Sequence, residues 1–571
     1  MNRNAENHFQ YAPMSNIERS KMPYVQPNIG TCKMAELVPF FSDETIQPMD
    51  TFQINCNMVL RLLTPITPTM ANMFVDLFFF FVPMRLVWEH TEEYFGENPN
   101  GAWIQETEYY TPIINSGENG FAVGSIMDYL YGAPVNVANL EVSALSLRAY
   151  VKCYNDWFRD QNWIAPKEER TDDSDITFDN TDPTKGGVPF KIAKYHDIIT
   201  SLLPAPQKGT AVSLPLGISA PVTLNSNTVQ VYGNGKTLGL QNASGNHYGF
   251  GLLNGSTNGI AATASYNKTI GTSGDYNIQS TVGVNVGLGI TTEQNGQSGI
   301  TGKLSDTSGT ADLTTATAST INSLREAFAY QRIMEKMARG GSRYTEIIKS
   351  FFGVNASYAR LQRAEYLGGK SIPLDMIEIA QTSSTDATSP QGNVAAMGKT
   401  VISDRMFTKS FDEWGILIGM FAIRQRHYYQ QGIEKQYKIR RKYERYFPQL
   451  AHLGEQPVYR EEIYATGTEE NDKTVLGFQE AWWFMRYRMA KITGYMRSGI
   501  TGSLDFWHQG DYYTSAPVIS EDFINETDTY LRRTLAVTDA TTHQFQFATQ
   551  IHGSVTRAMP TYSIPGLIDH F

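Results

Sequence analysis

The chain has 571 residues and a formal net charge of −10; 41% of its residues are hydrophobic and only 18% are charged. This apolar content excludes a wholly disordered protein, and the longest apolar run, Leu77 to Val82, is far shorter than the roughly 20 residues that span a bilayer. The N-terminus is polar and has no signal-peptide core, so we expect the chain to fold where it is made. Because the net charge is negative, any contact with nucleic acid must be local.

Residues 1–35 are predicted to form an extended N-terminal arm. The stretch is polar, and Pro13, Pro23 and Pro27 interrupt any periodic pattern. Such a segment buries too little apolar surface to fold alone, so we expect it to lie against another part of a structure.

Two long strands are predicted after this arm. Thr51 to Leu63 is rich in apolar and β-branched residues, and Asn72 to Val82 contains four consecutive phenylalanines. Pro68 and Pro83 limit the phenylalanine run to strand length, and a run without a polar face indicates a strand that is buried on both sides. We therefore predict that Asn72 to Val82 is a central strand.

Two helices are predicted from three- and four-residue spacing. Between Asn139 and Trp163, aromatic and aliphatic residues alternate with polar ones such as Arg148, which favours an amphipathic helix. A second helix begins with the capping-box pattern at Ser323 and ends at Gly340, and its Met and Phe residues are expected to pack into a core. A short third helix is predicted from Arg343 to Phe352.

Residues 208–320 are predicted to be an insertion. The composition changes abruptly there to Gly, Ser, Thr, Asn and Ala, with very few charged residues. This pattern is compatible with a flexible linker. Apolar residues at strand-like spacing between glycines favour instead an ordered, exposed lobe of short strands and tight turns.

The motifs of catalysis and metal binding are missing. The three cysteines are an odd number at wide spacing, so we predict reduced, buried thiols and neither a disulfide framework nor a zinc site. Gly-Lys-Ser/Thr triplets at 235, 369 and 398 lack the first glycine of a phosphate loop and are interpreted as turns. Carboxylates near aromatic residues, Asp505 beside His508 and the pair Asp43 and Glu44, are interpreted as hydrogen-bonded loop carboxylates. We expect no catalytic residue, metal or cofactor.

One basic and aromatic segment is the candidate binding site. Its tyrosines alternate with cations, and the candidate nucleic-acid ligands are Arg424, Arg426, Arg440, Arg441, Lys442 and Arg445. Guanidinium groups bind phosphates and tyrosine rings stack on unpaired bases, which suits single-stranded nucleic acid. The same residue types are enriched in subunit interfaces. A solvated surface is the third interpretation.

Several motifs in order along the chain resemble the major capsid proteins of gokushoviruses, small icosahedral single-stranded DNA phages of the microvirus family. The matching segments are residues 43–52 (DETIQPMDTF), 80–88 (FFVPMRLVW), 360–369 (RLQRAEYLGG), 452–456 (HLGEQ) and 562–571 (YSIPGLIDHF). Two departures from the family pattern are Ala364, where proline is usual, and the N-terminal arm, which lacks the family's basic segment.

The resemblance implies a mainly β fold, an eight-stranded antiparallel jelly roll with large loop insertions and a few helices. Residues 36–207 and 321–571 would form the shell domain, and residues 208–320 a protrusion at the three-fold axes, in which Asn225 to Ser305 would contribute to host attachment. The implied function is a T=1 icosahedral shell of sixty copies around a circular single-stranded DNA genome. The implied partners are an internal scaffolding protein, a DNA pilot protein, a small basic DNA-packaging protein and a host surface receptor. The implied locations are the virion and, during assembly, the host bacterial cytoplasm.

A β-rich carbohydrate-active enzyme or adhesin is the alternative class. The Trp and Tyr content and the Gly/Ser/Thr/Asn-rich insertion support it. Shell proteins sediment as large particles, whereas such an enzyme stays small and hydrolyses glycans, so sedimentation separates the two classes.

Overall fold

The computed structural model describes residues 19–70, 73–96, 107–210, 321–340, 349–350, 362–380, 382, 394–537 and 542–562, together with four short strands between residues 240 and 289. The chain divides into two compact units: Val212–Phe328, and Met1–Ala211 with Ala329–Phe571. Within the unit Val212–Phe328 the strands form two antiparallel pairs, β8 (Leu240–Gln241) with β9 (His247–Tyr248) and β10 (Gly251–Asn254) with β11 (Val286–Gly289). The rest of the predicted insertion lies outside the described residues.

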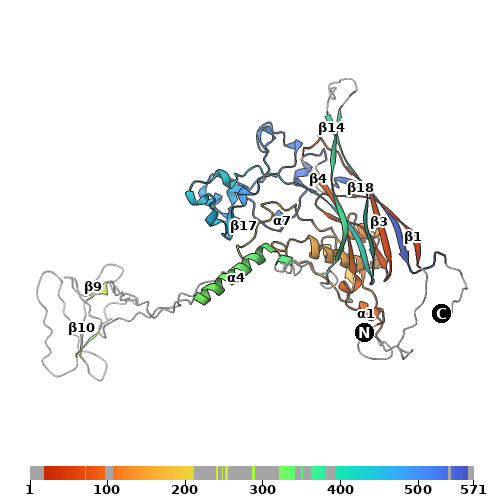
Figure 1. The fold of residues 1–571 in the computed structure, drawn as a ribbon, viewed down its shortest axis with the longest axis horizontal. Helices are drawn as coiled ribbons and strands as arrows, with labels where there is room; N and C mark the ends of the chain where they lie inside the picture. The colour runs from red at the N-terminus through yellow and green to blue at the C-terminus, as the bar shows by residue number, and fades with distance from the viewer. Residues whose placement is uncertain are drawn as a thin grey trace. The chain divides into compact units, whose positions relative to one another are not determined.

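The other unit, Met1–Ala211 with Ala329–Phe571, is the main unit, and it is built on two large antiparallel sheets (Figure 1). The five-stranded sheet has the order β1 (Ser20–Cys32), β18 (Phe545–Arg557), β3 (Thr51–Leu62), β14 (Val394–Ser410) and β13 (Asp375–Ala380). The four-stranded sheet has the order β12 (Glu365–Pro373), β4 (Met73–Pro83), β15 (Gly415–Gln425) and β2 (Leu37–Ile46). Apart from β13, these strands enter the two sheets in the chain order of a jelly roll. The predicted mainly β, antiparallel jelly-roll class is confirmed.

The space between the sheets is filled by aromatic side chains. Phe421 of β15 packs edge-on against Phe547 of β18, with ring centroids 5.1 Å apart, and Phe79 of β4 lies 5.8 Å from Phe407 of β14. In β3, alternate residues point into this core while the others face outward, as a strand with one buried face requires.

Strand β4 confirms the prediction of a central strand that is buried on both faces. Phe79 and Phe81 point into the core between the sheets, whereas Phe80 points into a second core on the opposite face. The second core is covered by α2 (Ile126–Tyr131), α3 (Leu145–Cys153) and the π-helical turn Tyr154–Phe158.

The helix predicted from Asn139 to Trp163 is shorter than expected. A strand, β6 (Glu141–Ser143), precedes α3, and the helix widens into the π-helical turn before it ends. Arg148, predicted on the polar face, is buried at 4% exposure because its guanidinium donates to the backbone carbonyls of Val87, Asp172 and Ser174. Local spacing cannot reveal such a set of acceptors.

The helix predicted to begin with a cap at Ser323 begins earlier, since α4 spans Ile321–Gly340 and Ser323 lies inside it. Its apolar stripe is not buried throughout: Phe328 is 58% exposed, although Met334 and Met337 are half-buried. The prediction of core packing is therefore wrong for Phe328. The third predicted helix falls largely outside the described residues.

Two of the glycine triplets interpreted as turns lie in strands instead. Gly369 is in β12 and Gly398 is in β14. A Cβ at Gly369 would lie only 2.1 Å from the carbonyl oxygen of Leu77 in β4, so the glycine is needed for close strand approach and not for a turn. The triplet at 235 lies outside the described residues. Cys32, Cys56 and Cys153 are buried and unpaired, as predicted.

The remaining short elements lie mostly in the connections between the core strands. They are α1 (Thr91–Tyr94), β5 (Ile113–Asn115), β7 (Ile176–Thr177), β16 (Glu455–Tyr459), α6 (Glu469–Asp472), β17 (Val475–Glu480), α7 (Glu521–Ile524) and α8 (Thr529–Arg532). A third apolar core around Trp482 and Trp483 holds the loops that follow β15 together.

Candidate functional site

The basic and aromatic segment begins at the end of β15 and divides into an interior part and an exposed part. Arg424 lies at the interior end, and its guanidinium forms an ion pair with Asp76 of β4, with Nε 2.8 Å from Oδ2. The same guanidinium lies 3.9 Å from the ring centre of Tyr195, whose hydroxyl donates to Asp76. Burial, more than the neighbouring charges, raises the pKa of Tyr195 to about 12. Arg424 therefore neutralises a buried carboxylate.

Arg426 and the tyrosines that follow lie in different surroundings. The Arg426 side chain is exposed, and its guanidinium lies 5.2 Å from the ring centre of Phe74. Tyr429 is buried and its hydroxyl donates to Asp197 at 2.7 Å. Only Arg426 of this stretch is open to a ligand.

His427 lies between two buried carboxylates. Its Nδ1 is 2.9 Å from Asp511 and its Nε2 is 3.1 Å from Glu526, and all three side chains have zero exposure. Burial alone would lower the pKa of His427, but the two carboxylates outweigh burial and raise it to about 10. The imidazolium in turn holds the pKa of Asp511 below its usual value against the opposing effect of burial. This trio ties the loops after β15 to the segment around residue 526.

The exposed part of the segment carries the other predicted cations. Arg440, Arg441, Lys442 and Arg445 are all exposed on short turns, where Tyr437 and Tyr443 are 65% and 75% exposed. Glu444 accepts the backbone N–H groups of Arg440 and Arg441 at 2.8 and 3.0 Å, and these bonds lower its pKa. The turn therefore presents guanidinium groups and tyrosine rings together to solvent.

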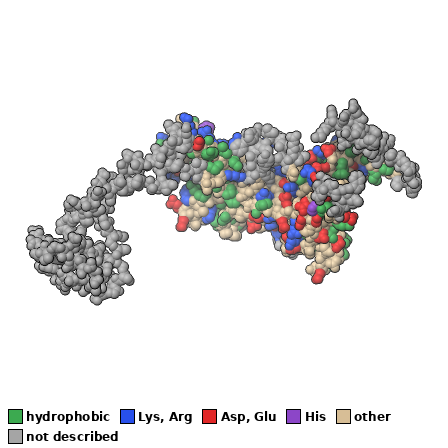
Figure 2. Space-filling model, turned by 90° about the horizontal axis from the view of Figure 1, so that it is seen from below, with side chains coloured by type: hydrophobic (Ala, Val, Ile, Leu, Met, Phe, Trp, Pro, Cys, Tyr) green, Lys and Arg blue, Asp and Glu red, His purple; other side chains and the backbone are tan. Residues whose placement is uncertain are grey.

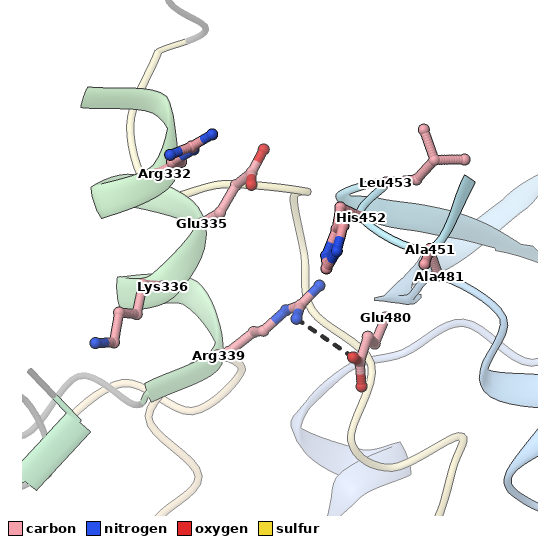
Figure 3. Close-up of a pocket in the computed structure, with 9 residues that line it drawn as sticks. All are labelled: Arg332, Glu335, Lys336, Arg339, Ala451, His452, Leu453, Glu480 and Ala481. Atoms are coloured by element: carbon pink, nitrogen blue, oxygen red, sulfur yellow. Dashed lines mark hydrogen bonds and ion pairs between the residues drawn. The ribbon is translucent and has the colours of Figure 1, made fainter. Parts of the chain in front are cut away.

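A charged cleft of about 430 Å³ lies between α4 and the loops near β16 and β17 (Figure 3). Arg339 reaches across it from α4 and pairs with Glu480 at 3.4 Å and with Glu455. His452 and Leu453, from the motif at 452–456, line the opposite wall. Since Arg339 of α4 pairs with Glu480 across it, the cleft joins α4 to the loops, and no sequence pattern had predicted this contact.

Two of the carboxylates considered for catalysis, Asp43 and Glu44, accept structural hydrogen bonds. Asp43 and Glu44 are adjacent in β2, so they point to opposite faces of the sheet. Asp43 accepts the hydroxyl of Tyr24 at 2.9 Å, while Glu44 accepts that of Tyr131 at 2.7 Å. The predicted hydrogen bonding of Asp43 and Glu44 is confirmed, but the prediction that they lie in loops is wrong, because both lie in β2. The imidazole of His508, near Asp505, accepts the backbone N–H of Gly510, and burial lowers its pKa.

Two wider searches cover only the residues that the structure describes. Among them, no group of three or more His, Cys, Asp and Glu side chains is arranged to hold a metal ion. None of the helices in the described ranges combines the length and apolar character needed to cross a bilayer. On the face shown in Figure 2, basic and acidic side chains lie interspersed.

Sequence reasoning missed two parts of this region. Asp76 was not singled out, although a carboxylate inside an apolar strand signals a buried partner. The trio around His427 was also missed, because its members lie up to 99 residues apart.

The jelly roll is the architecture of many viral shell proteins. The family model described as "Capsid protein (F protein)" matches residues 11–567, so the chain belongs to this family of capsid proteins. It is 36% identical over 583 residues to capsid protein VP1 of Bdellovibrio phage phiMH2K, covering 100% of this chain and 99% of that protein. It is 35% identical to capsid protein VP1 of Chlamydia phage 1, covering 98% of each chain. It is also 35% identical to capsid protein VP1 of Spiroplasma virus 4, covering 97% of this chain and 96% of that protein. The resemblance inferred from the motifs is confirmed: the protein is a phage capsid protein and a component of the virion.

Proposed function

We propose that this protein is the major capsid protein of a small phage and that sixty copies assemble into a T=1 icosahedral shell around a circular single-stranded DNA genome. The observation that carries the proposal is the jelly-roll sandwich combined with full-length similarity to three phage capsid proteins. Large connections between the strands, with exposed Arg and Tyr, supply the side chains that subunit contacts favour.

Other components follow from the same proposal. An acidic shell protein with a net charge of −10 repels phosphate overall, so a small basic DNA-packaging protein offsets the genome charge. An internal scaffolding protein and a DNA pilot protein act during assembly in the host bacterial cytoplasm. The lobe from Asn225 to Ser305 contributes to attachment to a host surface receptor, since exposed loops commonly carry recognition.

Electron microscopy of negatively stained material tests the assembly proposal. The full-length protein, co-expressed with the phage's scaffolding protein, should give uniform particles with icosahedral outlines. Small species that hydrolyse glycans would instead support the carbohydrate-active class.

The exposed cations at 440–445 are proposed to contact DNA. Replacing Arg440, Arg441 and Lys442 by alanine should leave particle yield intact and lower the DNA content of each particle, measured as the absorbance ratio at 260 and 280 nm. Arg424→Ala is not included in this variant, because Arg424 pairs with Asp76 in the interior. Loss of all particles would instead assign the segment to a subunit contact, and unchanged yield with unchanged DNA would contradict both assignments.

A further inference from the structure

The five-stranded sheet has one face in the core and one face turned outward. On β1 the outward positions include Val25 and Ile29, which are 60% and 85% exposed, and on β14 they include Val401 at 58%. The helices α2 and α3 pack on the other sheet, against β2, β4 and β15. Within the described chain this outward face is therefore an uncovered sheet surface.

All charged side chains at the outward positions of β1, β18, β3 and β14 are cations. They are Lys21, Arg61, Lys399 and Arg405. Register aligns three of them in two rows: Arg61 is opposite both Gln546 and Lys399, and Asn55 is opposite both His552 and Arg405. Lys21 is opposite Thr556, outside both rows. Asp404, the neighbour of Arg405, faces the other side and pairs with Lys370 of β12. Asp375 of β13 lies opposite Lys399 on the same face, so four cations against this one carboxylate leave the face with a local net positive charge in a chain whose net charge is −10.

Neutral amides are interspersed with these cations. The side chains are Gln53, Asn55, Asn57, Gln546 and Gln550. Asn57 accepts a hydrogen bond from Ser403 at 2.8 Å, which shows that the outward positions of β3 and β14 meet side by side. Amides donate and accept hydrogen bonds, so they suit phosphate oxygens, sugars and base edges.

The same surface is poorly suited to a protein partner. The outward positions of β1, β18, β3 and β14 hold no Phe, Tyr or Trp, whereas the centres of protein interfaces are enriched in these residues. Pro23 and Pro27 on the edge strand β1 lack the N–H groups that a further strand would need. Cations that outnumber the carboxylates, together with amides, complement a polyanion.

We propose that the outward face of the five-stranded sheet binds single-stranded DNA through its phosphates, with Arg61, Lys399 and Arg405 as the principal contacts. Because phosphate contacts carry no sequence information, binding is independent of base sequence. Arg61 and Arg405 lie in rows six residues apart along β3, about 20 Å at 3.4 Å per residue, so one subunit holds a short stretch of DNA. This inference rests on the proposed function, and it implies that this face of the sheet is directed toward the genome.

Salt-dependent binding tests it. Binding of the purified full-length protein to a fluorescent thymidine oligonucleotide is measured by anisotropy over a range of NaCl concentrations. For single strands the slope of log K against log salt is about −0.7 per phosphate contact, so the variant R61Q/K399Q/R405Q should weaken the slope by about 2. The matched control R61K/K399R/R405K keeps every charge and should keep the slope. An unchanged slope in the glutamine variant would overturn the proposal.

Two further measurements distinguish failure of this DNA-binding assignment from failure of the proposed capsid function. If the triple variant is poorly folded by circular dichroism, the single variant R405Q should still weaken the slope by about 0.7, and no change would refute the assignment. Particle formation by the unaltered protein is followed separately by electron microscopy. Absence of particles contradicts the proposed function, whereas normal particles with normal oligonucleotide binding by the glutamine variant contradict only the assignment of this face. Normal binding together with loss of particles would mark the face as a protein contact and would also overturn it.

Discussion

Asp76 is a carboxylate inside a strand of phenylalanines, and the structure holds it there with Arg424 and Tyr195. Removing one member of a buried pair leaves the other charge without compensation. Asp76→Asn should therefore lower the free energy of unfolding by roughly 3–5 kcal/mol, measured by guanidinium denaturation. The matched control is Lys370→Ala, which removes an exposed pair with Asp404 and should cost less than about 1 kcal/mol. Equal effects of the two substitutions would contradict the buried role of Asp76.

His427 makes stability depend on pH. Its pKa is raised from the ordinary value of 6.5 to about 10, so the folded state binds a proton that the unfolded state releases earlier. The stabilisation is fully present below pH 6.5 and is lost as the pH rises through about 10. We expect the urea midpoint of the unaltered protein to fall across this window more steeply than that of His427→Gln. The exposed His196→Gln serves as a control and should follow the unaltered protein; parallel curves for all three would rule out this role.

At the scale of elements, β4 is the strand on which both main cores depend. Phe79 has zero exposure and packs against Phe40, Phe41 and Phe407. Phe79→Asp should prevent soluble expression, because an unpaired buried charge costs several kcal/mol against a total stability of roughly 5–15 kcal/mol. Phe79→Leu keeps the site apolar and should remain soluble. A soluble aspartate variant that still assembles would show that this strand is not central.

The same elements show what a sequence reveals about this fold. Strands β3 and β4 were predictable from local sequence patterns. Buried and outward residues alternate along β3, and β4 contains a continuous apolar run. Arg148 and Arg424 were not: each looks like a surface cation, and its acceptors lie at distant positions, in the case of Arg424 a carboxylate 348 residues away. The exposed cations from Arg440 to Arg445 were predictable as a cluster, because they are local in the sequence and short turns keep them together.

For the molecule as a whole, the unit Val212–Phe328 is separable in sequence from the jelly roll. Replacing residues 225–305 by a short Gly/Ser linker should still permit particles, because loop closure costs only about 0.6 kcal/mol for each doubling of loop length. The shortened particles should adsorb less to the host. Particle yield and cell binding, compared with those of intact particles, check both expectations. Complete loss of assembly would show that the lobe is a structural contact needed for assembly, and undiminished adsorption would contradict its role in attachment.

The position of β18 determines when the five-stranded sheet can be completed. This strand lies between β1 and β3, pairing Arg557 with Ser20 and Thr556 with Thr51, although almost the entire chain separates it from β1. While the ribosome is still making the chain, β1 and β3 have open edges that face each other without a partner. Contacts at such sequence separation slow folding, and open edges invite aggregation. A chain that terminates before β18 therefore lacks the strand that joins β1 to β3 and keeps both of these edges open.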